Sequence, residues 1–371
     1  YTLVAYERRA VLRCCAAGLG LLKRVDECLM HDRFMDEALA EGRKGIGLTS
    51  PNPAVGAVLV RGGKILARGH HRAAGRPHAE IECLRNFGEP VPEDATLYVT
   101  MEPCSTSGRT PPCIDALIEA KVRRVVIGTV DPNPLHAGRG IKLLRAAGVE
   151  VIDGIRAAEC GALNEAFNKW IRTKRPFVVA KCGMTLDGRL TRPACEDRSI
   201  TSTASRRHAN RFRAQVDAIL VGAETVRADN PELTVRGVRG ARQPWRVVLT
   251  RSQQLPKTAH LFSDRFAQRT LVFRDQSLEL VLDSLGEKEV TSVLIEGGGD
   301  ILSQALDARL IDKFHIYVGA MFSGGSVLAF AGCGASSTNS SVRLRDVRYE
   351  RIASDVLVVG NAEYPETSSE Y

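Results

Sequence analysis

Four residues between positions 78 and 113 have the types and the spacing of a catalytic metal site. His78 opens a predicted helix, Cys104 directly follows a predicted strand, and Cys113 begins the next helix. One imidazole and two thiolates suit zinc, and three protein ligands leave the fourth tetrahedral position open, as in catalytic zinc sites. Bound zinc lowers the pKa of water to about 7, which makes hydroxide available at neutral pH. We therefore expect His78, Cys104 and Cys113 to hold a catalytic zinc ion.

Glu80 stands two residues after the predicted ligand His78 and can reach a water in the open position. A His-x-Glu pattern followed by Pro-Cys and a second Cys is similar to the zinc nucleobase deaminases, where the glutamate moves protons and binds no metal. The general deaminase pattern has two residues between its cysteines, whereas eight residues separate Cys104 from Cys113. Two alternatives are buried thiols beside a capping His78, and a structural zinc with a fourth ligand. The joint occurrence of the four residues favours the catalytic site.

Length and composition fit a two-domain globular protein of 371 residues. Hydrophobic residues make up 44%, charged residues 25% and aromatic residues 5%, which lies in the globular range. The net charge of +8 suits an anionic partner such as a phosphorylated small molecule. Basic residues are densest at 121–124 and 206–213, where they resemble solvated helix faces, and exposed aromatic stacking platforms are not indicated. We therefore expect no nucleic-acid partner.

Ten scattered cysteines in a long chain favour reduced thiols and a cytoplasmic location. The apolar run at 11–22 is interrupted by Arg13 and is shorter than the ~20 residues of a spanning helix, so we expect no membrane anchor. Residues 1–30 match no pattern that we can interpret. Two domains are predicted, at 31–173 and 174–365, because a basic stretch ending in Pro176 precedes a new strand.

Apolar periodicity predicts an α/β layered arrangement in both domains. In the first domain we expect helices at 34–43, from 78, after 112 and at 140–147, with strands at 54–60, 64–67, 96–100 and 124–130. In the second we expect strands at 177–182, 218–221, 245–249, 270–273, 292–295 and 314–318, alternating with helices at 203–215, 278–285 and 301–308. The second domain has no Gly-x-Gly-x-x-Gly after a strand, which argues against a Rossmann dinucleotide site.

The segment EPCSTSGRTPPC at 102–113 closely resembles the signature of the bifunctional riboflavin-biosynthesis deaminase/reductases. Further matching stretches are TSPNPAVGAV at 49–58, DPNP at 131–134, AGRG at 137–140, MTLDG at 184–188, DAILVG at 217–222, TVRADNP at 225–231 and LTVR at 233–236. The resemblance covers about residues 32–359. The resemblance implies a cytidine-deaminase-like three-layer α/β domain followed by a dihydrofolate-reductase-like α/β domain.

The resemblance also implies two reactions. The first domain would hydrolyse the 2-amino group of 2,5-diamino-6-ribosylamino-4(3H)-pyrimidinone 5′-phosphate with zinc. The second would reduce the ribosyl group with NADPH to give 5-amino-6-(5-phosphoribitylamino)uracil. We further expect a homo-oligomer. Two alternatives are a deaminase whose second domain is not catalytic, and an RNA-binding protein with a deaminase fold.

By position, the resemblance assigns roles to further residues. Glu80 and Asp229 are the catalytic candidates. Substrate contacts are expected from Asn52, His71, Arg109, Asp131, Asn133, Arg213, Arg236 and Glu296. Cofactor contacts are expected from Lys181, Thr185, Asp187, Thr201, Gly297, Gly298 and Gly299, the last three because backbone N–H groups at a helix start can receive a pyrophosphate. Arg251 is a further candidate for the 2′-phosphate of NADPH, and a surface arginine is the alternative.

The sequence departs from the family pattern in two places. Thr106 and Ser107 stand where the family usually has two histidines, and Ser199 stands where it commonly has tryptophan. The first departure affects the expected substrate contacts of the deaminase, and the second the wall of the reductase pocket. The zinc ligands and Glu80 are unaffected, so deamination chemistry is still expected.

Overall fold

The computed structural model describes residues 18–106, 111–190, 199–251 and 254–365. These residues form two compact units. The first comprises the described residues up to Gly45 together with Ala54–Asn164, and the second comprises Ile46–Pro53 together with the described residues from Glu165 onward. Among the helices in the described ranges, none combines the length and the apolar character that a membrane span requires.

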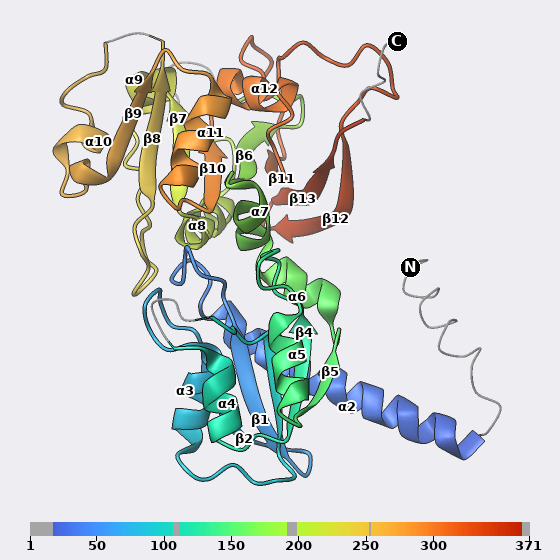
Figure 1. Ribbon diagram of the computed structural model, residues 1–371. Coiled ribbons are helices and arrows are strands. Elements are labelled where there is room, and N and C mark those ends of the chain that lie inside the picture. The colour runs from blue at the N-terminus through green and yellow to red at the C-terminus, as the bar shows by residue number, and fades with distance from the viewer. Residues whose placement is uncertain (1–17, 107–110, 191–198, 252–253, 366–371) are drawn as a thin grey trace, which may run out of the picture. The chain divides into compact units, whose positions relative to one another are not determined.

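The first unit is built around a five-stranded sheet in the order β2-β1-β3-β4-β5 (Figure 1). β1 pairs antiparallel with β2 and β3, whereas β3, β4 and β5 run parallel. Its strands are β1 (Gly56–Arg61), β2 (Lys64–His70), β3 (Thr96–Met101), β4 (Arg124–Thr129) and β5 (Glu150–Asp153), and its helices are α2 (Gly18–Arg43), α3 (Ala79–Phe87), α4 (Cys113–Glu119), α5 (Arg139–Ala146) and α6 (Ala157–Leu163).

Helices cover both faces of this sheet. On one face α3, α4 and α5 pack on the sheet through Cys83, Leu117 and Leu144, which are fully buried. On the other face, Phe34 and Leu39 of α2 pack with Cys160 of α6. The β3 strand is buried along its whole length, as expected for a central strand covered on both sides. The first unit is therefore a three-layer α/β domain.

The second unit contains an eight-stranded sheet in the order β12-β13-β11-β6-β10-β7-β8-β9. The strands from β11 to β9 are parallel, and a C-terminal antiparallel hairpin of β12 and β13 extends one edge. The strands are β6 (Phe177–Thr185), β7 (Ala218–Gly222), β8 (Trp245–Thr250), β9 (Thr270–Arg274), β10 (Ser292–Glu296), β11 (Lys313–Gly319), β12 (Arg343–Ile352) and β13 (Asp355–Glu363), and the helices are α7 (Glu165–Thr173), α8 (Thr203–Phe212), α9 (Ala223–Asp229), α10 (His260–Ser263), α11 (Leu278–Glu287) and α12 (Gly299–Asp307).

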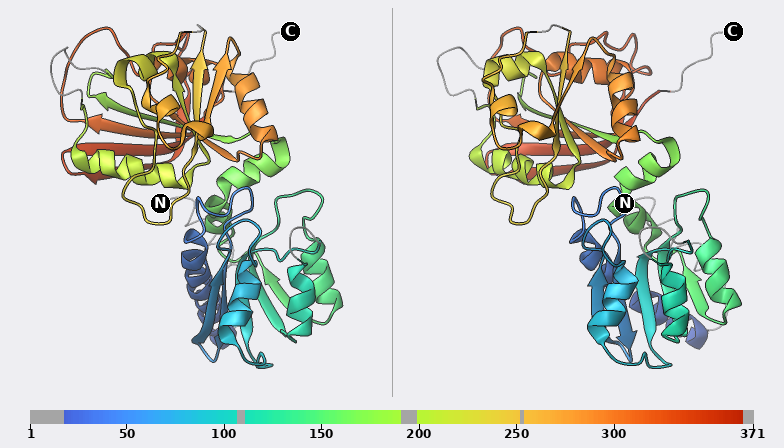
Figure 2. Two further views of the ribbon diagram at one scale, coloured as in Figure 1. Left: turned by 90° about the vertical axis from the view of Figure 1, so that its left-hand side faces the viewer. Right: turned by 60° about the vertical axis from the view of Figure 1, so that its left-hand side comes forward.

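Two apolar clusters lie on opposite faces of the eight-stranded sheet. Val281 of α11 and Leu302 of α12 pack on one face, and Val226 of α9 and Leu261 of α10 pack on the other. Figure 2 shows these layers from two further sides. Every residue of β7 and β10 is buried, as expected for parallel strands between two helical layers.

Helix α7 belongs to the second unit because three of its side chains form polar contacts with residues of that unit. Lys169 Nζ lies 2.6 Å from Asp312 Oδ2, Trp170 Nε1 donates a 2.9 Å hydrogen bond to the Gly286 carbonyl, and Glu165 pairs with Lys313. The basic stretch before Pro176, where the domain boundary was predicted, therefore follows and overlaps the end of a packed helix, which its composition did not indicate.

Candidate functional site

The predicted zinc ligands converge in the first unit. His78 Nδ1 lies 3.2 Å from Cys113 Sγ and 3.4 Å from Cys104 Sγ. The three potential ligand atoms all lie within 4.8 Å of one another. His78 is the N-cap residue of α3, yet its side chain makes no capping hydrogen bond. The imidazole therefore faces the two thiols and does not cap the helix.

Secondary structure fixes each of these side chains. Cys104 follows β3, and Cys113 is the first residue of α4, whose backbone N–H donates to Cys104 Sγ at 3.3 Å. Gly69 of β2 lets α3 approach the sheet, because a Cβ there would lie 2.3 Å from Cys83 N and 2.4 Å from Ala79 O. A side chain at position 69 would push away the helix that begins beside His78.

The electrostatics of this cluster suit a metal centre. A hydrogen bond with Cys104 raises the pKa of His78, and hydrogen bonds from Cys113 and His78 lower the pKa of Cys104 despite its burial. Thiolate is the form of cysteine that binds metal. Glu80, in the first turn of α3, is only 3% exposed, and burial raises its pKa. One nitrogen and two sulfur donors in this arrangement fit zinc with an open position.

Other predicted deaminase residues fall in different places. His71 is buried against His78, with ring centroids 5.1 Å apart, and its Nδ1 donates to the Pro77 carbonyl at 3.0 Å. Asp131 and Asn133 share one tight turn, in which Asp131 Oδ1 accepts from Asn133 N at 2.8 Å. Asn52 lies in Ile46–Pro53, which belongs to the second unit. Arg109 lies outside the described residues, as does Ser107.

The second unit contains a buried charged cluster around Glu296, the last residue of β10. Arg213 binds this carboxylate in bidentate fashion, with Nε to Oε1 at 2.6 Å and Nη2 to Oε2 at 2.9 Å. Lys181 of the neighbouring strand β6 places Nζ 3.6 Å from Oε2. Burial alone would raise the pKa of Glu296, but the charges of Arg213 and Lys181 lower it to about 2. Three predicted contact residues thus form one ionised cluster.

Thr185 and Asp187 form a second predicted group. Thr185 Oγ1 donates to Asp187 Oδ1 at 2.5 Å, and Asp187 accepts the backbone N–H groups of Ser323 at 3.2 Å and Gly324 at 2.8 Å. These hydrogen bonds, the one from Thr185 first, lower the pKa of Asp187 to about 2. Asp187 therefore anchors the segment 323–324, a partner that the sequence did not indicate.

The predicted glycine loop joins β10 to α12. Gly297 and Gly298 have positive φ values of 88° and 65°, and Gly299 is the first residue of the helix. A Cβ on Gly299 would lie 2.0 Å from the Leu328 carbonyl oxygen. Backbone N–H groups at the start of a helix suit a phosphate. Thr201 lies beside Gly183 of β6, where a Cβ would meet Thr201 Cγ2 at 3.2 Å.

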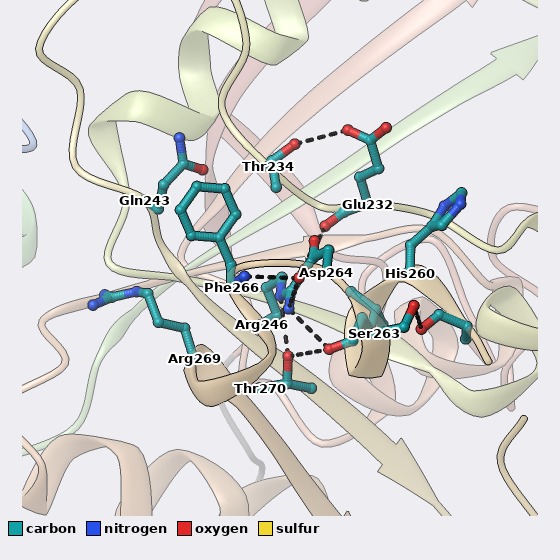
Figure 3. Close-up of polar contacts among 12 residues, drawn as sticks. Glu232, Thr234, Gln243, Arg246, His260, Ser263, Asp264, Phe266, Arg269 and Thr270 are labelled. Carbon is teal, nitrogen blue, oxygen red and sulfur yellow. Dashed lines mark hydrogen bonds and ion pairs between the residues drawn. The ribbon is translucent and has the colours of Figure 1, made fainter. Parts of the chain in front are cut away.

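The segment 232–236, which carries Arg236, has no regular structure and is held by side chains from other elements (Figure 3). Arg246 of β8 donates to the Glu232 carbonyl at 3.2 Å. Gln243 Oε1 accepts from Val235 N at 2.9 Å, and its Nε2 donates to Val235 O at 3.0 Å. Arg246 is only 1% exposed and also forms a bidentate pair with Asp264, at 2.6 and 2.9 Å.

Two other predicted reductase residues are exposed. Asp229 is the last residue of α9, and Arg251 follows the end of β8. Arg236 is also exposed at its side chain, 64%, and lies 3.4 Å from Glu232. The charged groups around Glu296 are largely buried and already paired with one another, whereas Asp229, Arg236 and Arg251 are exposed. The cluster around Glu296 is therefore the better candidate for a preformed site.

Comparisons with known proteins identify a related family for each of the two units. Residues 29–129 match the model of the cytidine and deoxycytidylate deaminase zinc-binding region, and residues 176–358 match the model of the RibD C-terminal domain. The chain is 37% identical to riboflavin biosynthesis protein RibD of Actinobacillus pleuropneumoniae, covering 88% of this chain and 93% of the relative. The chain belongs to the RibD family.

Solved RibD structures have the same fold. Acinetobacter baumannii RibD matches with a TM-score of 0.83 at 33% identity, covering 91% of this chain and 99% of that chain. A Thermotoga maritima structure described as a diaminohydroxyphosphoribosylaminopyrimidine deaminase/5-amino-6-(5-phosphoribosylamino)uracil reductase matches with a TM-score of 0.81 at 34% identity, again covering 91% and 99%. RibD of Escherichia coli strain K12 is 37% identical, covering 78% of this chain and 88% of the relative.

Membership of the RibD family confirms several predictions. The two-domain α/β fold class is confirmed, and so is a bifunctional deaminase and reductase of riboflavin biosynthesis. The cofactors are zinc for the deaminase and NADPH for the reductase. A domain that matches a reductase family model over 176–358 does not favour a non-catalytic second half or an RNA-binding protein.

Proposed function

We propose that this chain hydrolyses the 2-amino group of 2,5-diamino-6-ribosylamino-4(3H)-pyrimidinone 5′-phosphate and then reduces the ribosyl group to yield 5-amino-6-(5-phosphoribitylamino)uracil. The observation that carries the proposal is the convergence of His78, Cys104 and Cys113 around a common point, with the buried Glu80 in the first turn of the same helix as His78. The substrate follows from the RibD family, whose Thermotoga maritima member is described by these two activities.

In the deaminase we assign the metal to His78, Cys104 and Cys113. Bound zinc supplies the acidity that lets water act as a nucleophile at neutral pH. Glu80 takes the proton of the attacking water on its carboxylate and gives it to the amino nitrogen, which leaves as ammonia. Burial raises the pKa of Glu80, and a carboxyl group with a raised pKa can hold a proton between these two steps. Asn52, His71, Arg109, Asp131 and Asn133 are assigned to substrate binding.

In the reductase NADPH supplies the hydride to C1′ of the ribosyl group. We assign Arg213, Arg236 and Glu296 to substrate binding. Lys181, Thr185, Asp187, Thr201 and Gly297 to Gly299 are assigned to the cofactor side, and Asp229 to proton donation. Lys181 and Arg213 keep Glu296 ionised, so its carboxylate accepts hydrogen bonds and does not act as an acid.

Domain limits, partners and location complete the proposal. We assign the deaminase to 31–173 and the reductase to 174–365, with α7 as the helix that joins them in sequence and packs on the second unit. We propose a homo-oligomer that acts on a phosphorylated pyrimidine and does not bind nucleic acid. None of the described cysteines forms a disulfide, which supports a cytoplasmic location.

The test is incubation with the diaminopyrimidinone substrate, with and without NADPH, followed by mass analysis. Without NADPH we expect only the deaminated ribosyl compound, and with NADPH the ribityl compound together with NADPH oxidation. Glu80→Ala should retain about one zinc per chain and make neither product, and Asp229→Ala should stop at the deaminated compound. An unchanged substrate mass with zinc-loaded wild-type protein would reject the deaminase, and salt-dependent RNA binding without turnover would reverse the assignment.

A further inference from the structure

The buried carboxylate of Glu102 binds four backbone N–H groups of one loop. Oε1 accepts from Gly140 N at 2.7 Å and from Ile141 N at 3.2 Å. Oε2 accepts from Asp131 N at 3.0 Å and from Gly138 N at 2.9 Å. Glu102 is 6% exposed and lies two residues before the zinc ligand Cys104. A single side chain therefore ties the loop 131–141 to the end of β3.

The fit between this carboxylate and the loop is close. A Cβ on Gly140 would lie 2.5 Å from the Pro103 carbonyl oxygen and 3.0 Å from Glu102 Oε1. Gly140 and Ile141 form the first turn of α5, where unpaired N–H groups and the helix dipole favour an anion. The carboxylate thus also caps α5, although it comes from a distant part of the chain.

The loop held in this way presents the two residues assigned to the pyrimidine. Asp131 Oδ1 accepts from Asn133 N, and Asn133 Oδ1 accepts from Leu135 N at 3.1 Å. These turn contacts leave Asp131 Oδ2 and Asn133 Nδ2 available to a ligand, since neither atom makes a hydrogen bond to the described residues. The backbone of Asp131 is itself fixed by Glu102.

We infer that Glu102 is a positioning residue of the deaminase, which sets Asp131 and Asn133 for substrate binding by holding the amides of the loop 131–141. The inference rests on the proposed function, because that function gives Asp131 and Asn133 their role. It concerns binding of the heterocycle and not the bond-breaking step, so the main effect of a substitution is expected in KM.

The test compares Glu102→Gln with Glu119→Gln, an exposed glutamate on α4 of the same unit. A glutamine amide offers one oxygen and one NH2 group, so two of the four loop N–H groups would face a donor. We expect E102Q to keep about one zinc per chain and wild-type NADPH oxidation on the deaminated intermediate. Its KM for deamination should rise about 10-fold or more, as for lost outer contacts of a site, and amide exchange of 131–141 should become faster. E119Q should match wild type.

A double-mutant cycle separates positioning from general stability. If Glu102 acts through the loop, E102Q combined with Asp131→Ala should raise KM no more than the larger single change, because coupled residues are not additive. Should E102Q not fold, Glu102→Asp keeps the charge but is one methylene shorter, and a smaller rise in KM with faster exchange is then expected. Wild-type KM and exchange in E102Q, full additivity, or loss of zinc with an unchanged loop would each overturn the inference.

The outcomes also separate this inference from the proposed function. If wild-type protein does not deaminate the diaminopyrimidinone, the proposed function fails, whatever Glu102 does. If wild type is active and E102Q has the same KM, only the positioning role fails.

Discussion

The two units each contain a buried glutamate, and the two carboxyl groups are in opposite electrostatic situations. Glu80 of the first unit is 3% exposed and Glu296 of the second is 7% exposed. Burial raises the pKa of Glu80, and the charge of His78 offsets this increase only in part. For Glu296 the same burial is outweighed by Arg213 and Lys181, which lower the pKa to about 2.

The difference shows that burial alone does not decide the protonation of a carboxyl group. Desolvation disfavours the charged form, whereas nearby cations and hydrogen-bond donors favour it. Glu80 has few such partners and suits proton transfer. Glu296 has a bidentate arginine and a lysine, so it remains a fixed anion in the reductase. The comparison predicts that substitutions at the two positions will affect different properties.

The largest expected effect is on deamination. Glu80→Gln removes the proton carrier but keeps the size of the side chain, so deamination should fall by about two to four orders of magnitude, as for a lost general acid/base. Zinc content and NADPH oxidation on the deaminated intermediate should match wild type. Glu82→Gln, on the same helix but paired with the exposed Arg72 at 2.9 Å, is the matched control. Loss of zinc from the Glu80 variant would indicate that Glu80 is a zinc ligand, which contradicts its assignment to proton transfer.

The next effect is on stability of the second unit. Glu296→Gln leaves Arg213 and Lys181 without their anion, and breaking a buried ion pair from one side typically costs about 3–5 kcal/mol. Denaturant unfolding, followed by a probe in the second unit, measures this loss. The exposed Glu287→Gln on α11 is the control. A Glu296 variant as stable as wild type would show that the pair contributes no net stability.

The pH dependence of unfolding tests whether the ionised form of Glu296 stabilises the fold. Because the folded-state pKa of Glu296 lies near 2 and its ordinary value is 4.5, the ionised group stabilises the fold above about pH 4.5. This contribution, on the order of 3 kcal/mol, is lost as the pH falls from about 4.5 toward 2. The stability difference between wild type and E296Q should therefore shrink across that window. A difference that stays constant from pH 5 to pH 2 would contradict the assignment.

The smallest effect is expected at a surface pair. Arg124 Nε lies 2.7 Å from Glu150 Oε2, and both side chains are about half exposed. An exposed ion pair contributes at most about 1 kcal/mol, so Glu150→Gln should change the free energy of unfolding by less than ~0.5 kcal/mol. An effect as large as that of E296Q would show that distance, and not burial, determines the strength of such pairs in this protein.

Sequence patterns located most of the elements that carry the sites. Strands β1 to β4 and β6 to β11 were predicted within a few residues because each contains an apolar run with turn residues near its ends. The hairpin of β12 and β13 was not predicted. β12 contains four arginines and is mostly exposed, so it lacks the alternation of a half-buried strand. Its backbone pairing with β13 forms it instead.

The hydrogen-bond partners of the site residues could not be predicted from the sequence. Asp187 was predicted as a cofactor contact, and nothing in the sequence indicated its hydrogen bonds to Ser323 and Gly324. Glu102 stood in the most specific motif of the chain without an assigned role, because its four amide partners lie about 30 to 40 positions later. Such contacts depend on where the loops pass in space, which spacing along the chain does not encode.

The sequence by itself identified the family and predicted the zinc ligands and the acid/base, because these residues sit in short motifs whose local geometry is set by a strand end and two helix starts. Only the tertiary structure decided which buried charges meet. Glu296, Arg213 and Lys181 come from separate parts of the chain, and parallel pairing of β10 with β6 brings two of them side by side. The pKa of Glu80 is raised and that of Glu296 is lowered because their neighbours differ, since both residues are buried glutamates.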